Sequence, residues 1–429
     1  MEPKKILIIT YYWPPAGGPG VQRWLTFVKY LPDFGIQPIV YVPENPTYPI
    51  VDEKLVKEVS DKAIILKHTI FEPYQLASLF SKNKTKKISS GIIPNQKKQS
   101  FLDKTFLWIR GNLFIPDARV FWVKPSVAFL EKYIVENTID TIVTSGPPHS
   151  LHLIGLELKQ KLNLKWFADF RDPWTTIGYH KSLRLSRFAA KKHKALERQV
   201  LNTADTIIVT SKTTKTEFEA ITSKPISVIT NGYDTEEVGK QTLDLKFSLA
   251  HIGSFLSERN PLILWESLVE LITEIPDFKS HLEIKLIGAV SQEVLETIQQ
   301  FGLNVYLNNL GYVSHVEAIA HQRKSQVLIL IEINSADTKS IIPGKLFEYM
   351  VSNRPIIAIG PRDSDFSEII TNTNTGVFFD YSEKLKLKRV ILDFYNQFLE
   401  GKLQSNGVGL QNYSRRNLTR NLVELLNKM

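Results

Sequence analysis

Residues 6–42 read ILIITYYWPPAGGPGVQRWLTFVKYLPDFGIQPIVYV, and this stretch decides the fold. The apolar runs at 6–10 and 38–42 are typical of buried parallel strands. Between them lie a loop dense in Pro and Gly and a segment, 21–31, whose apolar residues recur mostly at helical spacing. Together they predict a βαβ unit with a Gly-rich first turn.

The same alternation continues along the chain. Further strands are expected at 141–144, 165–169 and 206–210, and a second series at 249–253, 282–287, 305–307, 327–331 and 355–359. Short strands alternating with helices predict an α/β protein with two doubly wound, Rossmann-like domains. We expect an N-terminal domain over 1–235, a second domain over 236–410, and a C-terminal helix over 411–429 that packs back on the N-terminal domain.

Composition narrows the class of protein. The chain has 429 residues, 43% of them hydrophobic and 23% charged, which is typical of a soluble globular protein. It has no cysteine, which excludes disulfides and thiolate catalysis. The N-terminus carries no pattern of a signal peptide, and no apolar run is long enough to span a bilayer. The sequence therefore predicts a cytoplasmic protein.

The chain is basic, with a net charge of +9, which suits anionic partners. No zinc-finger spacing or RNP-type motif is present, so we do not expect nucleic acid. A lysine-rich stretch, 81–100, precedes a run of aromatic and aliphatic residues at 101–114. This segment suggests either an anionic membrane surface, peripheral on the inner face of the cell membrane, or a solvated loop beside aromatics that pack into the first domain.

The stretch PGKLFEYMVSNRPIIA, residues 343–358, carries the clearest chemistry. Gly344 and Lys345 stand at an expected helix start, where backbone N–H groups and a positive charge favour an anion. Glu348 lies three residues after Lys345, so both side chains can face one side of the helix. This pair suits a ligand with an anion at one end and hydroxyls at the other, such as a nucleotide diphosphate sugar. The alternative is a capped helix with a surface ion pair.

Four segments, in order, resemble glycosyltransferase family 4, whose members have the GT-B fold of two doubly wound domains facing a cleft. PPAGGPG at 14–20, with Arg23 after it, resembles the Gly-Gly loop of the family. VITNGYD at 228–234 is similar to its IPNGVD signature, and GSFLSERNP at 253–261 occupies the place of its G-R-x-x-x-x-K-G segment. Residues 343–358 resemble its nucleotide-sugar helix and the strand that follows.

The resemblance implies site residues in both domains. The donor would be bound by Gly17, Gly18, Gly253, Arg259, Gly344, Lys345, Leu346 and Glu348. Chemistry at the anomeric carbon would involve His149, Asp172, Arg259 and Lys345. The acceptor side would include Arg23, Asp169, Arg171 and Trp174. Glu348 would accept hydrogen bonds from the ribose hydroxyls.

The residues alone leave alternatives at four of these positions. A single histidine such as His149 is often structural, and Trp174 fits either a sugar face or the core. The acids beside Arg171 could instead form a local ion pair that fixes their loop. His149 and His152 lack a third ligand nearby in sequence, and Asp363-Ser364-Asp365, which looks like a metal-binding DxD, carries turn residues. We therefore expect no metal and no cofactor beyond the donor.

Two positions depart from the family pattern. The first acid of its E-x7-E motif is Ser340 here, and the Arg that usually follows the first glycine of the G-R segment is Ser254. Because the missing acid lies near the donor sugar in the family, its loss leaves the identity of the sugar open. Arg259 stands at the position of the family's Lys.

The resemblance implies a glycosyltransferase that moves a sugar from a nucleotide-sugar donor to an acceptor hydroxyl with retention. The acceptor would be a saccharide or lipid-linked saccharide, in cell-surface polysaccharide or glycolipid synthesis. The alternatives are a nucleotide-sugar epimerase of the same fold, which needs no acceptor, and a non-catalytic nucleotide-sugar binding protein, which Ser340 and Ser254 favour.

Overall fold

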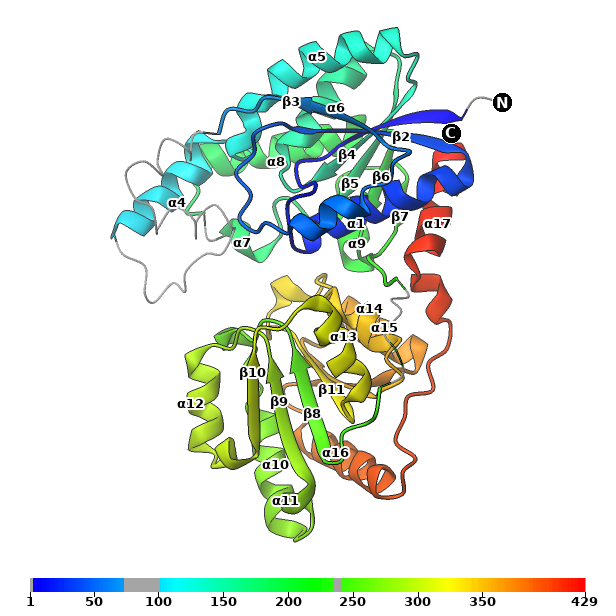
Figure 1. The fold of residues 1–429 in the computed structure, drawn as a ribbon. Coiled ribbons are helices and arrows are strands. Elements are labelled where there is room, and N and C mark those ends of the chain that lie inside the picture. The colour runs from blue at the N-terminus through cyan, green and yellow to red at the C-terminus, as the bar shows by residue number, and fades with distance from the viewer. Residues whose placement is uncertain (1–2, 73–100, 182, 235–238, 240, 429) are drawn as a thin grey trace. The chain divides into compact units, whose positions relative to one another are not determined.

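The computed structural model describes residues 3–72, 101–181, 183–234, 239 and 241–428. The chain divides into two compact units (Figure 1). The first comprises Met1–Asn231 and Arg415–Met429, and the second comprises Gly232–Ser414. Each unit is built around one parallel sheet, so the predicted α/β class with two Rossmann-like domains is confirmed.

The sheet of the first unit has seven strands in the order β3-β2-β1-β4-β5-β6-β7. Every pair is parallel, with Ile8, for example, opposite both Val40 and Val143. The strands are β1 (Lys4–Ile9), β2 (Ile36–Pro43), β3 (Ile64–His68), β4 (Thr141–Gly146), β5 (Lys165–Phe170), β6 (Thr206–Val209) and β7 (Ile226–Val228). The central strands are buried on both faces, as near-continuous apolar runs require.

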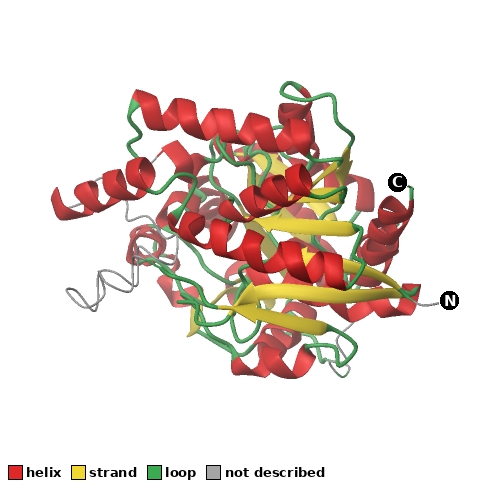
Figure 2. Ribbon diagram, turned by 90° about the horizontal axis from the view of Figure 1, so that it is seen from above, coloured by secondary structure: helices red, strands yellow, loops and turns green. Residues whose placement is uncertain are grey.

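Helices cover both faces of this sheet (Figure 1 and Figure 2). On one face Trp24 and Val28 of α1 share a core with Leu418 and Leu422 of the C-terminal helix α17. The opposite core takes apolar residues from α5, α6 and α8. The helices of this unit are α1 (Pro19–Tyr30), α4 (Phe101–Leu113), α5 (Val123–Glu136), α6 (Ser150–Lys161), α7 (Gly178–Lys181), α8 (Arg187–Thr203), α9 (Lys212–Glu219) and α17 (Arg415–Asn427), with 3-10 turns η1 (Leu31–Phe34), η2 (Glu53–Glu58) and η4 (Ala118–Trp122).

The second unit repeats the plan with six parallel strands in the order β10-β9-β8-β11-β12-β13. The strands are β8 (Phe247–Ile252), β9 (Leu282–Ile287), β10 (Leu307–Gly311), β11 (Val327–Ile331), β12 (Ile356–Gly360) and β13 (Gly376–Asp380). The helices are α10 (Leu262–Glu274), α11 (Phe278–His281), α12 (Gln292–Gln300), α13 (His315–Lys324), α14 (Lys345–Met350), α15 (Asp365–Thr373) and α16 (Lys384–Leu399), with 3-10 turns η5 (Ser257–Arg259), η6 (Leu303–Tyr306), η7 (Ala336–Thr338) and η8 (Leu410–Tyr413). None of the helices within the described ranges is long and apolar enough to cross a membrane.

The expected strand at 305–307 is wrong. That stretch begins as the 3-10 turn η6, in which Val305 is 75% exposed, and β10 starts only at Leu307. The strands β3, β7 and β13 were not predicted. They are short or lie at sheet edges, where burial is incomplete and the apolar signal is weak. The basic stretch 81–100 lies outside the described residues.

Candidate functional site

The carboxyl edge of the second sheet brings two glycine turns together. Gly253 follows β8 and Gly288 follows β9. Their φ angles of 116° and 117° are rarely adopted by residues other than glycine. A Cβ on Gly253 would lie 2.9 Å from Nζ of Lys345, and one on Gly288 would lie 2.6 Å from the carbonyl oxygen of Gly253. Gly253 therefore allows the Lys345 side chain to pack directly on its backbone, and Gly288 allows the backbone of Gly253 to pack against its own.

Lys345 is the first residue of α14, after Gly344, as the sequence predicts. Its Nζ lies 3.1 Å from Nε2 of the buried His251, whose Nδ1 lies 3.1 Å from the carbonyl oxygen of Ile329. A proton on Nδ1 satisfies that carbonyl and leaves Nε2 to accept from Lys345. Burial, assisted by the positive charge of Arg259, lowers the pKa of Lys345 to about 7. The ammonium has no ion-pair partner among the described residues.

Arg259 is held by an acid that the sequence analysis missed. Its Nη2 lies 3.0 Å from Oε2 of Glu332, and its Nε lies 3.2 Å from Oε1. Glu332 comes directly after β11 and is buried, and its Oε1 also accepts from the amide of Ile333. This bidentate pair fixes the guanidinium and offsets much of its charge, while Nη1 makes no hydrogen bond to any residue that the structure describes.

Glu348 lies on α14 at the same edge. Its Oε2 accepts a hydrogen bond of 2.8 Å from Nε2 of Gln322, and its Oε1 lies 3.9 Å from Nε2 of His315. The side chain is 30% exposed, so a hydroxyl can still reach it. Leu346, in contrast, is fully buried in the core and its amide donates to the carbonyl of Pro343. Neither the side chain nor the amide of Leu346 is therefore available to the donor in this structure, and its expected contact with the donor stays a prediction.

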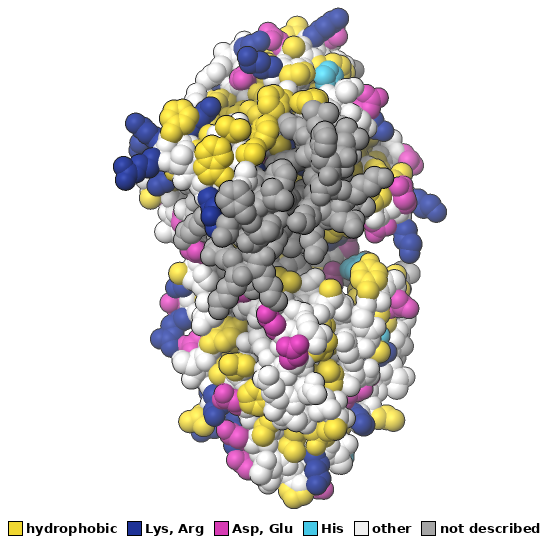
Figure 3. Space-filling model, turned by 90° about the vertical axis from the view of Figure 1, so that its left-hand side faces the viewer, with side chains coloured by type: hydrophobic (Ala, Val, Ile, Leu, Met, Phe, Trp, Pro, Cys, Tyr) yellow, Lys and Arg dark blue, Asp and Glu magenta, His cyan; other side chains and the backbone are white. Residues whose placement is uncertain are grey.

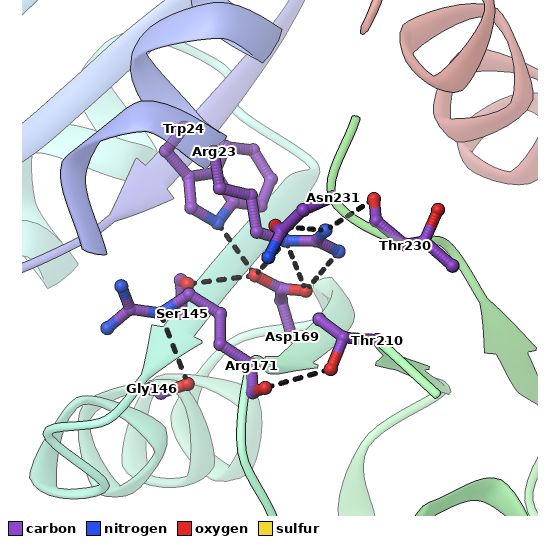
Figure 4. Close-up of polar contacts among 9 residues, drawn as sticks. All are labelled: Arg23, Trp24, Ser145, Gly146, Asp169, Arg171, Thr210, Thr230 and Asn231. Atoms are coloured by element: carbon purple, nitrogen blue, oxygen red, sulfur yellow. Dashed lines mark hydrogen bonds and ion pairs between the residues drawn. The ribbon is translucent and has the colours of Figure 1, made fainter. Parts of the chain in front are cut away.

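In the first unit, Asp169 at the end of β5 is the centre of a buried network (Figure 4). Its carboxylate accepts from Nη2 of Arg23 at 2.8 Å, from Nε1 of Trp24 at 2.7 Å and from Oγ of Ser145 at 2.8 Å. Nη1 of Arg23 donates to the carbonyl of Thr230 at 3.0 Å. Burial alone would raise the pKa of Asp169, but the charge of Arg23 and these hydrogen bonds lower it overall.

Arg23 and Asp169 therefore fit a positioning role better than the expected contact with the acceptor. Both side chains are almost fully buried, at 2% and 0% exposure, and the carboxylate is saturated by protein donors. The network ties α1 to β4, to β5 and to residues 230–231, where the first unit ends.

Arg171 likewise binds the backbone. Its Nη1 donates to the carbonyl of Gly20 at 2.6 Å, and its other nitrogens donate to the carbonyls of Gly146 and Pro147. The guanidinium thus links the start of α1 to the loop after β4. The local ion pair with Asp172 that the sequence left open does not form, and Asp172 makes no hydrogen bond to any described residue.

Asp172 is consequently the available carboxylate of this loop. Burial raises its pKa, and the charge of Arg171 offsets only part of that effect. A partly exposed carboxylate with a raised pKa and no protein partner can accept a proton or a hydroxyl hydrogen bond. Asp169 and Asp172, only three residues apart, therefore have different chemistry.

His149 stands immediately before α6, and its ring stacks on Trp174 at 4.9 Å with the planes 2° apart. Trp174 is 1% exposed and its Nε1 donates to Nδ1 of His193 at 3.1 Å, so it is a core residue rather than an open sugar platform. Neither ring nitrogen of His149 has a hydrogen-bond partner within the described structure. Burial, with the neighbouring His152, lowers the pKa of His149 well below its usual value, so the ring is neutral near pH 7.

The Gly-Gly loop leads directly into α1. Gly18, with φ of 87°, precedes the helix, and the amide of Gly17 donates to the carbonyl of Ile50. A Cβ on Gly17 would lie 2.9 Å from Cγ2 of Ile50. The tight approach places the amino end of α1 at the carboxyl edge of the first sheet.

Within the described ranges, no three His, Asp or Glu side chains are arranged to hold a metal ion. Asp363 lies in a turn with φ of 58°, and Asp365 begins α15.

Comparisons with known proteins agree with this architecture. The family model for Glycosyltransferase Family 4 matches residues 93–237. A sucrose-phosphate synthase from Thermosynechococcus elongatus is 13% identical, with 99% of this chain and 98% of that chain covered and a TM-score of 0.60. A glycosyltransferase from Rickettsia africae is 15% identical, with 100% and 99% covered and a TM-score of 0.59. A structure from E. coli described as trehalose-6-phosphate bound with UDP-2-fluoro glucose is 9% identical, with 99% of each chain covered and a TM-score of 0.61.

No curated protein sequence matches this chain. The solved structures show that it has the GT-B fold, and together with the family model they confirm the resemblance to glycosyltransferase family 4. Sequence reasoning missed His251, Gln322 and Glu332. The signal for Glu332 was its place after an apolar strand, the position where cleft residues of parallel sheets stand.

Proposed function

We propose that the protein is a glycosyltransferase that transfers a sugar from a nucleotide-sugar donor to an acceptor hydroxyl. The observation that carries the proposal is the pairing on α14 of Lys345, an ammonium without a carboxylate partner, with Glu348, a partly exposed carboxylate. The first would bind the diphosphate and the second the ribose hydroxyls. Nη1 of Arg259 adds a further donor for the phosphates.

The proposed chemistry expels a nucleoside diphosphate from the anomeric carbon, so positive groups should meet the charge that develops on the phosphates. Lys345 and Arg259 would stabilise that charge from the second unit. In the first unit, Asp172 and the unpartnered nitrogens of the neutral His149 ring would orient acceptor or sugar hydroxyls. From the family resemblance we also propose that the reaction retains the configuration at the anomeric carbon. The proposed acceptor is a saccharide or a lipid-linked saccharide.

The donor site can be tested by thermal shift against UDP, GDP, ADP, dTDP and CMP sugars with EDTA present. A ligand that binds only the folded protein raises its melting temperature by mass action. We expect one nucleotide family to stabilise the protein. Glu348→Ala should abolish this shift, whereas Glu293→Ala, which removes an exposed carboxylate of α12 in the same unit, should keep it.

Stabilisation by none of these donors, or equal shifts in both variants, would refute the site. Product analysis then separates the activities that share it. A glycosyltransferase requires an acceptor for sugar transfer, an epimerase converts the donor alone, and a non-catalytic binding protein gives a shift without any product.

A further inference from the structure

The first unit carries a basic face that the proposed donor chemistry does not use. On α8 the residues Arg187, Lys191, Lys194 and Arg198 follow one another at spacings of four, three and four, so they form a single stripe along the helix. We call them the basic stripe. All four are exposed, and none makes an ion pair with a carboxylate in the described part of the chain. Glu197, the acid of this helix, is buried and accepts from the amide and hydroxyl of Thr175.

Large apolar side chains are exposed near the same helix. Phe188, beside the first residue of the stripe, is 74% exposed. On α4, Trp108 is 46% and Leu113 is 63% exposed. Phe121 forms edge-to-face contacts with two other rings: its ring centroid lies 5.9 Å from that of Phe114, which follows α4, and 6.0 Å from that of Phe71.

The end of α4 is hydrogen-bonded to the segment that precedes α8, which brings the exposed side chains of α4 close to the first turn of α8. Oδ1 of Asn112 on α4 accepts from the amide of Ser186 at 2.7 Å, and its Nδ2 donates to the carbonyl of Arg184 at 3.2 Å. Gly111 allows this approach, because a Cβ there would lie 2.6 Å from Cδ2 of Leu185. Figure 3, which looks from the side on which α4 lies, shows hydrophobic side chains gathered on this face of the first unit.

We infer that this α4–α8 surface, consisting of the basic stripe with Trp108, Leu113, Phe121 and Phe188, docks on an anionic lipid bilayer. Basic side chains are attracted to the negative surface potential of such a membrane, and exposed aromatic side chains enter the interface between headgroups and acyl chains. The basic stripe alone would be typical of a solvated helix face. The exposed aromatic side chains alone could bind any apolar partner. The combination of the two, with no exposed acid of α8 among them, matches the chemistry of anionic lipid.

The inference is independent of the proposed donor site, because every residue in it belongs to the first unit. If the proposed donor site and the membrane-docking surface are both correct, the acceptor would be presented to the protein from the membrane.

Flotation of the full chain with lipid vesicles tests the inference. We expect binding to vesicles of mixed phosphatidylcholine and phosphatidylglycerol, weak binding to phosphatidylcholine alone, and loss of binding at high salt. Arg187→Gln/Lys191→Gln/Lys194→Gln should lower partitioning by roughly fivefold for each cation, about a hundredfold in all. Trp108→Ser/Phe188→Ser should lower it by about tenfold or more.

Matched control variants remove equal charge or an equally exposed ring elsewhere. Lys132→Gln/Lys386→Gln/Lys402→Gln removes three exposed lysines, and Tyr312→Ser removes a ring that is 91% exposed, so both should bind vesicles as the unmodified protein does. Equal losses in test and control variants, or no flotation with anionic vesicles, would overturn the inference. So would tight binding to a short oligonucleotide without vesicle binding, since the basic stripe would then serve a nucleic acid.

Discussion

If the proposed donor site is correct, Lys345 should make the affinity for the donor depend on pH. Burial and the charge of Arg259 lower its pKa to about 7, from about 10.4 in an unfolded chain. A diphosphate bound at Nζ favours the charged ammonium, so the donor should raise this pKa and take up a proton on binding. From about pH 7 upward, until the pKa of the bound state is reached, affinity should fall about tenfold per pH unit, which corresponds to about 1.4 kcal/mol.

Isothermal titration calorimetry in buffers of different ionisation enthalpy measures this proton uptake directly. With the nucleotide sugar that the thermal screen selects, we expect uptake approaching one proton at about pH 8 and little at about pH 6. The corresponding free nucleoside, which has no phosphates, is the matched control and should take up none. In Lys345→Arg the guanidinium is charged throughout this pH range. Provided that this variant still binds the donor, its affinity should no longer depend on pH.

The lowered pKa of Lys345 also makes the stability of the free protein depend on pH. Between about pH 7 and about pH 10 the unfolded chain holds the Lys345 proton and the folded chain does not, so this residue makes the free protein more stable as pH rises. Donor-induced stabilisation should therefore shrink across the interval. A dissociation constant that stays flat between about pH 6 and about pH 9, with no buffer-dependent heat, would refute the assigned role of Lys345.

Three further outcomes follow from the structure. Asp169→Asn leaves the buried Arg23 without its counter-charge and should lower the free energy of unfolding by about 3–5 kcal/mol in urea denaturation; a loss under about 1 kcal/mol would contradict the network. Gly253→Ala forces a side chain to φ of 116° and to within 2.9 Å of Nζ of Lys345, so calorimetry should show donor affinity reduced by about tenfold or more. Asp172→Asn should preserve the donor-induced thermal shift and reduce turnover by about a hundredfold in a product assay; unchanged turnover would remove Asp172 from the chemistry.

Local signals in the sequence predict much of the fold and part of the site. Gly344 and Lys345 mark the start of α14, and the spacing to Glu348 predicts that both side chains lie on one edge, since this depends only on helical geometry. The continuous apolar runs likewise predict the buried central strands. The short strands β3, β7 and β13 escape prediction because their burial depends on neighbours far away in the chain.

The hydrogen-bond donors to Asp169 come from residues far away in the chain, so the sequence could not distinguish its environment from that of Asp172. Asp169, near the end of β5, and Asp172, in the loop after that strand, stand only three residues apart, and the sequence left both open as members of a local ion pair with Arg171. The fold delivers Arg23, Trp24 and Ser145 to Asp169, whereas Arg171 turns to backbone carbonyls and leaves Asp172 without a partner. No local sequence pattern records which donors the fold brings from α1 and from β4.

The ion pair between Arg259 and Glu332 changes the charge balance of a site that already differs from the family pattern at two positions. Ser340 replaces the first acid of the E-x7-E motif and Ser254 replaces an arginine, so the site has lost one charge of each sign from the family pattern. Glu332 then offsets the charge of Arg259 through two hydrogen bonds. Lys345 remains as the cation without a carboxylate partner among the described residues of this edge. Because its pKa is about 7, protonation of one amine should set how strongly the second unit attracts a diphosphate.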